Sequence, residues 1–326
     1  MPRAELDPAL SLRVLGAREL RYDDRPQLGE DRPGHVRAAS GLAMVGGRLA
    51  IIQDDCAFIG YVSDQVTAVP LPRGPNGRRR FEEAIGNKAD KLDLEACVVV
   101  PGDRTGEGQL GDELWAFGSG STPMREKILI VGFTTRLHDA SPFYRKLREE
   151  LSAPSPHESF RVAPVVNIEG AALVGKELLL FHRGNTGPHD PGPMVFRMSR
   201  AAFQKWLASE GVVPEIDGAQ HYDLGEVDGH RIGFTDAVAV GARVFFLAAA
   251  EASPNAIDDG RVLASRIGVI DDGAVRMATL EIDGVPIKAE GLAFDPANPT
   301  RAWITIDPDD VATPAKLYEV ELVGSW

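Results

Sequence analysis

The sequence predicts an all-β protein, a five-bladed β-propeller closed by its N-terminal strand and carrying short helical inserts. Two observations support this fold class. The chain contains 34 glycines and 23 prolines among 326 residues, as turn-rich β proteins require. One sequence pattern also recurs five times along it. We expect residues 1–326 to form a single propeller domain.

In each copy of the pattern, a small or acidic residue is followed by Gly or Ala, an apolar run, a turn and a second apolar run. The copies begin with ASGLAMV, LEACVVV, NIEGAALV, TDAVAV and AEGLAF. The third copy continues into PMVFRMS and GAQHYDLGEV, so each unit supplies four strands. A four-stranded antiparallel sheet repeated around an axis is a β-propeller.

The fifth unit ends after three strands, and the N-terminal segment LSLRVLGAREL (Leu10–Leu20) resembles a strand. We therefore expect this segment to become the outer strand of the last blade and to close the ring, which removes an exposed sheet edge. The stretches SPFYRKLREELS and SRAAFQKWLASEG have helical periodicity and form the inserts. The alternatives are a pair of β-sandwiches with coincidental similarity and a propeller with six blades.

Composition excludes several functional classes. The net charge of −13 argues against binding to nucleic acid, whose backbone attracts basic surfaces. No apolar run is long enough to span a membrane, and the N-terminus has no secretory signal, so we expect a cytoplasmic, monomeric protein. The two cysteines, Cys56 and Cys97, are expected to be buried free thiols.

The acidic start of the repeats suggests a metal site. The inner strand of each blade lines the central channel, so its first residues lie near one mouth of that channel. The aligned positions are Ser40, Glu95, Glu169, Asp236 and Glu290. Carboxylates this close repel one another unless a cation or protons intervene. A ring of hard oxygen ligands favours Ca²⁺; the alternative is that these side chains bond to backbone amides and latch neighbouring blades together.

Other polar groups are predicted to share this mouth and to bind a small anionic ligand. Arg side chains and Gly/Ser loops suit phosphate or carboxylate groups. The predicted anion-binding residues are Lys88, Lys91, Ser119, Ser121, Arg125 and Arg183. Asp55 or Asp307 is the predicted general base, whereas His182 is expected to be structural.

Five blades with a Ser/Glu ring at the inner-strand starts resemble the calcium-activated nucleotidases, or apyrases. That family binds a central Ca²⁺ and hydrolyses nucleoside di- and triphosphates. Ser40, Glu95, Glu169 and Glu290 match its ring, whereas Asp236 departs from the hydroxyl residue that the family has there. The segments GNKADKLDLEA and NIEGAAL also resemble a family of uncharacterised bacterial propellers, loosely similar to phytase-like esterase propellers.

Two functional hypotheses follow. The first is a Ca²⁺-dependent hydrolase of a phosphoester, a phosphoanhydride or another anionic substrate, in which Lys88, Arg125 or Arg183 stabilises negative charge. The second is a non-catalytic propeller that binds a ligand or protein and holds a structural metal. Fold alone does not separate the two hypotheses.

Overall fold

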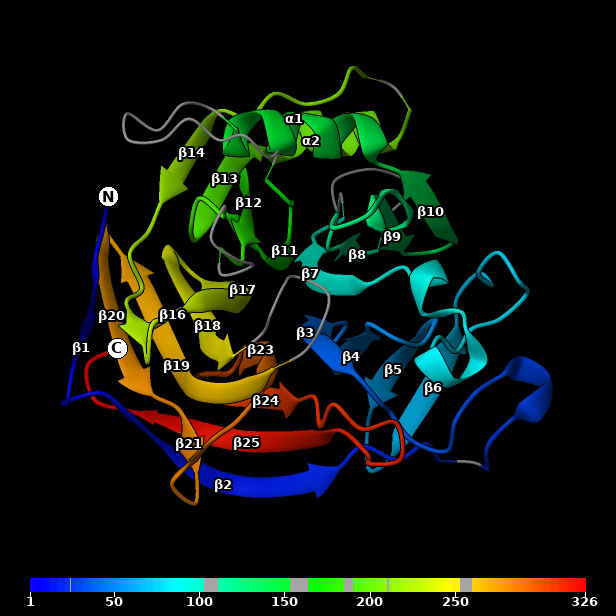
Figure 1. Cartoon of the computed structure of the whole chain (residues 1–326), viewed down its shortest axis with the longest axis horizontal. Coiled ribbons are helices and arrows are strands. Elements are labelled where there is room, and N and C mark those ends of the chain that lie inside the picture. Colours follow the sequence, from blue (N-terminus) through cyan, green and yellow to red (C-terminus); the bar gives the residue numbers. More distant parts are fainter. Residues whose placement is uncertain (24, 103–110, 153–163, 185–189, 210, 253–259) are drawn as a thin grey trace.

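The computed structural model describes the whole chain except residues 24, 103–110, 153–163, 185–189, 210 and 253–259. In the described part, five antiparallel sheets surround one axis as the blades of a β-propeller (Figure 1). The predicted fold class is therefore confirmed.

The first three blades each contain four strands in chain order. The first blade consists of β3 (Ala39–Val45), β4 (Arg48–Gln53), β5 (Phe58–Val62) and β6 (Val66–Pro70). The second consists of β7 (Leu94–Val100), β8 (Glu113–Gly118), β9 (Lys127–Val131) and β10 (Thr135–Asp139). The third consists of β11 (Ile168–Val174), β12 (Glu177–His182), β13 (Met194–Ser199) and β14 (Gly218–His221).

The N-terminal segment completes the last two blades. The fourth blade consists of β17 (Gly233–Val240), β18 (Arg243–Ala252), β19 (Arg261–Asp271) and β20 (Ala274–Thr279). The fifth consists of β23 (Ala289–Asp295), β24 (Asn298–Ile306) and β25 (Lys316–Val323). Strand β2 (Ser11–Glu19) pairs antiparallel with β25 as the outer strand of the fifth blade. The predicted closure is confirmed.

The structure also contains several very short strands that pair outside the predicted pattern. β1 (Ala4–Leu6) pairs in parallel with β20 and gives the fourth blade a fifth strand. Two further pairs, β15 (Glu226–Val227) with β16 (His230–Arg231) and β21 (Glu281–Ile282) with β22 (Val285–Pro286), lie in the connections between blades. All of these strands have two or three residues, too few for a periodic signal in the sequence.

The two α-helices lie in the predicted inserts. Elsewhere in the described part of the chain, short 3₁₀ turns lie at Leu28–Glu30, Glu83–Ile85, Lys88–Asp90 and Pro123–Arg125. Helix α1 (Ser141–Leu151) connects the second blade to the third, and α2 (Arg200–Leu207) connects β13 to β14. The Ser199 hydroxyl accepts a hydrogen bond from the Ala202 amide and caps α2. Phe143 of α1 packs edge-on against Phe203 of α2, with ring centroids 5.0 Å apart. None of the helices in the described part of the chain is long and apolar enough to cross a membrane.

The blades approach closely along the axis, which explains the small residue of the repeat. A Cβ atom added to Gly170 would lie 2.8 Å from the Ala237 backbone nitrogen of the next blade. A Cβ at Gly41 would meet the Ile52 side chain at 2.9 Å. Glycine therefore permits the close approach at these two positions, whereas the second and fourth blades have Ala96 and Asp236 at the equivalent position. Cys56 and Cys97 are buried free thiols, as predicted.

Candidate functional site

A β-bulge interrupts each inner strand close to its first residue. In four blades, the residue that the strand register skips belongs to the predicted ring: Ser40, Glu95, Glu169 and Glu290. In the fourth blade, the skipped residue is Thr235, whereas Asp236 pairs with Leu247 one position further along the strand. The bulge positions therefore carry three glutamates and two hydroxyls, and the alignment that assigned Asp236 to the ring was wrong by one residue.

Asp236 instead links two blades. Its Oδ1 accepts a hydrogen bond from the Ala237 amide at 2.7 Å, and its Oδ2 accepts one from the Leu292 amide of β23 at 2.6 Å. The residue is 1% exposed, and burial raises its pKa well above the usual range. Asp236 occupies the position that holds Gly or Ala in the other blades. It is the inter-blade latch that the sequence offered as the alternative to a ligand.

The two hydroxyls of the ring also bond to a neighbouring blade. Ser40 Oγ donates to the Leu94 carbonyl at 2.5 Å, and Thr235 Oγ1 donates to the Ala289 carbonyl at 2.7 Å. Each acceptor directly precedes a ring glutamate, Glu95 or Glu290. The hydroxyls therefore fix the backbone that carries these two carboxylates.

The three ring glutamates face one another across the axis. Burial, followed by nearby carboxylates that include Glu169 and Glu290, raises the pKa of Glu95 well above its usual range. Burial likewise raises the pKa of Glu290, with Glu169 among the contributing charges. The pKa of Glu169 is also raised by burial, against the opposing effect of Arg183. A proton or a cation in this mouth would relieve the repulsion.

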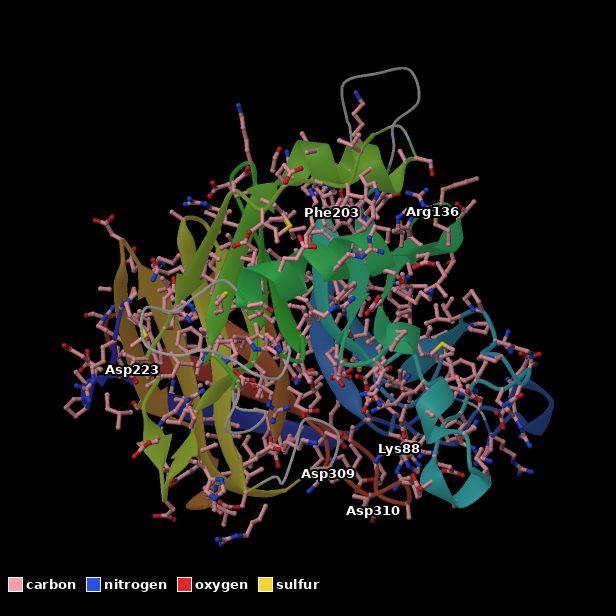
Figure 2. The ribbon with its side chains drawn as sticks, turned by 45° about the horizontal axis from the view of Figure 1, so that its top comes forward. Lys88, Arg136, Phe203, Asp223, Asp309 and Asp310 are labelled. Atoms are coloured by element: carbon pink, nitrogen blue, oxygen red, sulfur yellow. The ribbon has the colours of Figure 1, made fainter. Side chains whose placement is uncertain are left out.

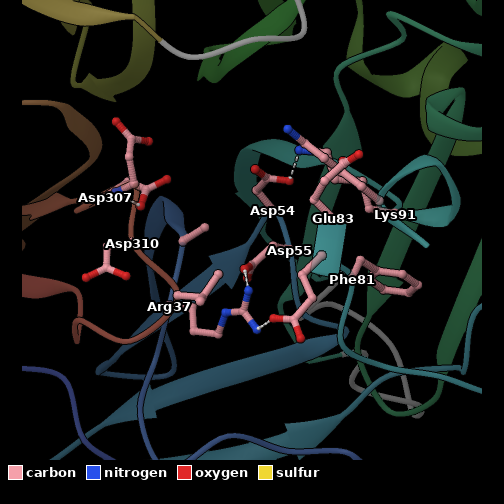
Figure 3. Close-up of a pocket in the computed structure, with 13 residues that line it drawn as sticks. Arg37, Asp54, Asp55, Phe81, Glu83, Lys91, Asp307 and Asp310 are labelled. Atoms are coloured by element: carbon pink, nitrogen blue, oxygen red, sulfur yellow. Dashed lines mark hydrogen bonds and ion pairs between the residues drawn. The ribbon is translucent and has the colours of Figure 1, made fainter. Parts of the chain in front are cut away.

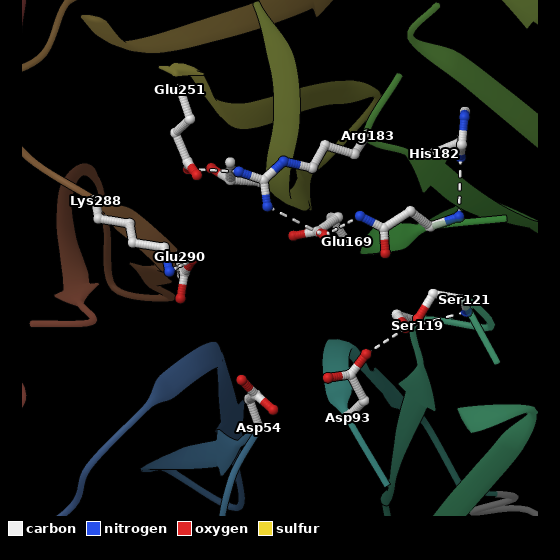
Figure 4. A network of polar contacts seen from close by, with 12 residues as sticks. Asp54, Asp93, Ser119, Ser121, Glu169, His182, Arg183, Glu251, Lys288 and Glu290 are labelled. Carbon is white, nitrogen blue, oxygen red and sulfur yellow. Dashed lines mark hydrogen bonds and ion pairs between the residues drawn. The ribbon is translucent and has the colours of Figure 1, made fainter. Parts of the chain in front are cut away.

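Two of the three glutamates have cationic partners (Figure 4). Arg183 Nη1 lies 3.3 Å from Glu169 Oε1, and its Nη2 contacts Glu251. Lys288 Nζ lies 3.3 Å from Glu290 Oε1 and also pairs with Asp307 and Asp309. Among the described residues, no hydrogen bond or ion pair reaches the Glu95 carboxylate.

Glu95 belongs to a compact acidic cluster with Asp54 and Asp93. One carboxylate oxygen of each lies within 4.8 Å of the others. Lys91 Nζ bridges Asp54 at 2.5 Å and Asp93 at 2.6 Å. Hard carboxylate ligands at this separation suit a divalent cation such as Ca²⁺, although any such ion would share two of the three ligands with the Lys91 ammonium.

Asp93 holds much of this side of the mouth together. It accepts from Ser119 Oγ and pairs with Arg125 Nη1 at 2.8 Å. Despite burial, Lys91 and Arg125 lower its pKa to about 2. Its backbone has a φ of 56°, in the left-handed region, a strained conformation that is common at functional sites. Asp93 is thus a permanently charged anchor for two cations.

Carboxylates hold two of the predicted anion-binding cations, Arg125 and Arg183. Arg125 is 5% exposed and also donates to Ser121 Oγ at 2.8 Å. Arg183 is held between Glu169 and Glu251. Neither guanidinium lines the described pocket that contains Lys88, so a shared anion site of these three cations stays a prediction.

A pocket of about 200 Å³ opens beside the acidic cluster (Figure 3). It lies between the first and fifth blades, and Figure 2 shows three of its lining residues, Lys88, Asp309 and Asp310, on one side of the molecule. Both predicted bases, Asp55 and Asp307, line it, as do Lys88 and Lys91. The pocket thus unites four of the predicted site residues, whose roles stay predictions.

Two carboxyl groups of this pocket are tuned toward neutral pH. Burial raises the pKa of Asp54 to about 7, although Lys91 opposes the shift. Burial also raises the pKa of Asp307 to about 6, against the effect of Lys288. Groups with such pKa values exchange protons readily near pH 7. Asp55 is less suited to act as a general base, because its Oδ2 is ion-paired with Arg37 Nη2 at 2.7 Å.

Sequence reasoning assigned no role at the mouth to Asp54, Asp93, Glu251 or Lys288. A signal existed in the alternation of Lys91, Asp93 and Glu95, which repeats in shorter form at Lys288 and Glu290. Alternate residues of an extended segment share one face. His182 is structural, as expected: its Nδ1 accepts from the Asn167 amide at 3.1 Å, and its Nε2 faces Asp190.

The opposite end of the channel has a different lining. A second pocket, of about 290 Å³, is lined by the later residues of all five inner strands. Cys97, Val98, Ala172 and Phe294 are representative, and Asp295 is the single charged residue in the lining. The channel is therefore acidic at one mouth and apolar at the other.

Several solved structures are distantly similar to this chain over most of its length. Virginiamycin B lyase from Staphylococcus aureus is 11% identical, with a TM-score of 0.39, over 96% of this chain and 100% of that one. MPT-4, a mannose phosphorylase from Leishmania mexicana, is 10% identical, with a TM-score of 0.43, over 94% and 88%. At these values, neither match bears on the chemistry of this chain. No curated protein matches the sequence.

The family comparison is more informative. A family of unknown function, DUF6929, matches residues 35–322. This range contains every inner strand and every residue of the mouth described above. The predicted likeness to an uncharacterised family agrees with this match, whereas the likeness to calcium-activated nucleotidases stays a prediction. The chain belongs to the DUF6929 family of unknown function.

Proposed function

We propose that the protein is a calcium-dependent hydrolase whose reaction takes place at the acidic mouth of the channel. One observation carries the proposal. The Glu95 carboxylate lies within 4.8 Å of those of Asp54 and Asp93, yet no cation of the described residues pairs with it, whereas its acidic neighbours each have one. A divalent ion would supply the missing positive charge.

The donor set supports Ca²⁺ over softer metals. Asp54, Asp93 and Glu95 offer only carboxylate oxygens, and no His or Cys belongs to the cluster. Oxygen ligands in an adaptable arrangement suit Ca²⁺, which takes six to eight of them. Because Lys91 competes for two of the ligands, we expect modest affinity, with Kd of about 10⁻⁵–10⁻³ M.

The adjoining pocket supports a hydrolytic role. Its walls are acidic, so an anionic substrate would be repelled in the absence of a bound cation. When bound, the ion would stabilise negative charge that develops on the substrate. Asp307, which lies outside the proposed ligand set, would accept the proton of the attacking water, because its pKa of about 6 matches a general base near neutral pH. Lys88, which lines the same pocket, would stabilise the leaving oxygen.

A substrate panel tests this function. Phosphomonoesters, phosphoanhydrides and carboxylic esters are incubated with the purified protein in Ca²⁺ and in a chelator. We expect turnover of one class in Ca²⁺ alone, and a loss of about 10²-fold or more in Asp307→Asn. The exposed substitution Asp64→Asn is the matched control. Equal turnover in chelator and in Ca²⁺ would refute the role of the ion.

A non-catalytic role is the second candidate, and the density of ion pairs around the mouth favours it. Arg183 joins Glu169 of the third blade to Glu251 of the fourth, which is an arrangement suited to holding blades together. Lys288 joins Glu290 to Asp307 and Asp309 within the fifth blade. In that case, Ca²⁺ would raise the melting temperature without producing hydrolysis of any substrate class.

A further inference from the structure

The apolar pocket at the far end of the channel has the features of a small-molecule site. It has a volume of about 290 Å³ and lies between the later residues of all five inner strands. Proteins bind small ligands in concave sites that are mostly apolar and hold a few polar groups. The volume lies at the lower end of the usual range for such sites, so it fits a short-chain or single-ring molecule.

The lining of this pocket begins where neighbouring blades touch. A Cβ atom added to Gly170 would lie 2.8 Å from the Ala237 nitrogen of the fourth blade. One added to Gly291 would lie 3.0 Å from Leu42 Cγ of the first blade. Both glycines come just before the lining residues of their strands. The pocket therefore extends from this level of close contact away from the acidic mouth.

One charged residue distinguishes the lining, and it occupies a repeat position that is valine in the other blades. Five residues after the bulge position of each inner strand, four blades have Val45, Val100, Val174 and Val240. The fifth blade has Asp295 there, and Asp295 lines the pocket. The register of β23 and β24 also shifts between Phe294 and Asp295, whereas the corresponding pairs of the other blades are regular. Such irregularities redirect side chains.

The Asp295 carboxylate is accessible to a ligand and has no cationic partner. It is partly exposed, and its Oδ1 accepts a hydrogen bond from the Ala297 amide at 2.8 Å. No ion pair of the described residues involves Asp295. The arginines of the two neighbouring turns have other contacts: the Arg48 guanidinium lies 4.7 Å from the centre of the Tyr61 ring, and Arg243 donates to the Trp326 carbonyl.

An apolar pocket with one unpaired carboxylate selects for a cation with an apolar body. An anionic amphiphile would be repelled by Asp295, and a neutral apolar molecule would gain only from burial of its surface. A protonated amine with a hydrocarbon part would gain from burial and also pair with the carboxylate.

We propose that the apolar pocket binds a small amphiphilic amine, with its hydrocarbon part against the inner strands and its ammonium group on Asp295. This inference goes beyond the proposed function, because it concerns the opposite end of the channel and does not depend on Ca²⁺.

Saturation-transfer difference NMR on the full chain tests the proposal with three six-carbon probes, n-hexylamine, 1-hexanol and hexanoate. Near neutral pH, the amine is protonated and hexanoate is ionised. We expect saturable transfer to n-hexylamine, with an affinity at least about fivefold higher than that of hexanoate and with 1-hexanol between them. No saturable transfer to n-hexylamine, or equal affinity for hexanoate, would overturn the proposal.

Two other occupants are separated by the same experiment. The titrations are made in chelator and again in saturating Ca²⁺, since the acidic mouth also attracts amines. Binding of n-hexylamine should be the same in both, and its loss in Ca²⁺ would place the amine at the mouth and overturn the assignment. A dimer that forms with rising protein concentration and excludes n-hexylamine would assign the pocket to a second copy of the chain and would also overturn it.

Variants locate the binding. Asp295→Asn keeps an acceptor for the Ala297 amide and removes the charge, so we expect n-hexylamine affinity about fivefold weaker and 1-hexanol affinity unchanged. Asp64→Asn, in the exposed turn between β5 and β6, is the matched control. Unchanged n-hexylamine affinity in Asp295→Asn would refute the role of the carboxylate.

A second variant tests the apolar walls. Ala239 lines the pocket, so Ala239→Leu reduces its volume and should weaken the binding of both n-hexylamine and 1-hexanol, with folding checked by circular dichroism. Unchanged affinities in folded Ala239→Leu would place the binding elsewhere on the molecule.

Discussion

The two ends of the central channel differ in chemistry although the same five inner strands build both. At the mouth, the strands begin with bulged residues that include three glutamates. At the other end, the same strands contribute aliphatic side chains and Cys97 to an apolar pocket. The regular part of each strand therefore serves packing, whereas the irregular first residues carry the polar chemistry.

A carboxylate at the apolar end should have the largest effect. Cys97 is 4% exposed and lies near Asp236, whose charge contributes, after burial, to raising the pKa of the thiol. Cys97→Asp would bury an uncompensated charge and should lower the free energy of unfolding by about 3–5 kcal/mol. Urea denaturation measures the loss, with Cys97→Ala as the control for lost packing. If Cys97→Asp were no less stable than Cys97→Ala, the two ends would not differ as described.

The latch at Asp236 should have the next largest effect. Asp236→Asn keeps the shape but leaves one of the two backbone amides, of Ala237 or Leu292, without an acceptor. We expect a loss of about 2–3 kcal/mol in the free energy of unfolding, against less than about 0.5 kcal/mol for exposed Asp64→Asn. Calcium affinity should not change, since this residue lies outside the ring. A large drop in calcium affinity would return Asp236 to the ring.

A smaller effect is expected at Thr235. Thr235→Val retains the shape and removes the hydrogen bond to the Ala289 carbonyl, at a cost of about 1–2 kcal/mol. Ser40→Ala should behave alike, because Ser40 makes the equivalent bond to Leu94. Thermal melting compares the two variants. A neutral result at Thr235 with a loss at Ser40 would show that the two bulge positions are not equivalent.

The pH dependence should be the mildest effect and should come from the mouth. Burial raises the pKa of Asp54 to about 7 and of Asp307 to about 6, so the folded protein binds these protons more tightly than the unfolded chain. Stability from these groups therefore rises as pH falls from about 8 toward about 4. The pKa of His35 is lowered by burial, which opposes the rise at pH values below about 6.5.

The contribution of Asp54 can be isolated from that of histidine. The difference in melting temperature between wild type and Asp54→Asn, followed from pH 8 to pH 5 in chelator, should change in favour of wild type as pH falls. Saturating Ca²⁺ should reduce this change, because the ion and the proton compete for the same carboxylates. A difference that is constant with pH would contradict the raised pKa of Asp54.

The sequence predicted the architecture well because the same pattern of small, acidic and apolar residues recurs at the inner strand of every blade. Five starts with a small or acidic residue before an apolar run placed the inner strands. The last blade lacked a fourth strand, and the strand-like segment Leu10–Leu20 supplied it as β2. β1 escaped notice because three residues in one parallel pairing leave no periodic pattern.

The site was predicted less completely, for reasons that lie in the backbone and in charge. The sequence of TDAVAV imitates the acid–small start, so only the observed bulge reveals that Thr235 and not Asp236 is the ring residue. The guanidinium groups of Arg125 and Arg183 were expected to serve a ligand, but carboxylates distant in the chain hold them. Such pairings depend on how blades meet, which residue types alone do not specify.

The most direct test of the account is calcium binding by wild type and by Glu95→Gln, measured by isothermal titration calorimetry after removal of metal with a chelator. We expect saturable binding of about one Ca²⁺ by wild type, with a matching rise in melting temperature. We also expect that Glu95→Gln binds at least about tenfold more weakly, while exposed Glu226→Gln binds like wild type. No calcium binding by wild type, or equal affinity in Glu95→Gln and wild type, would contradict the claim that Ca²⁺ binds at the Glu95 carboxylate.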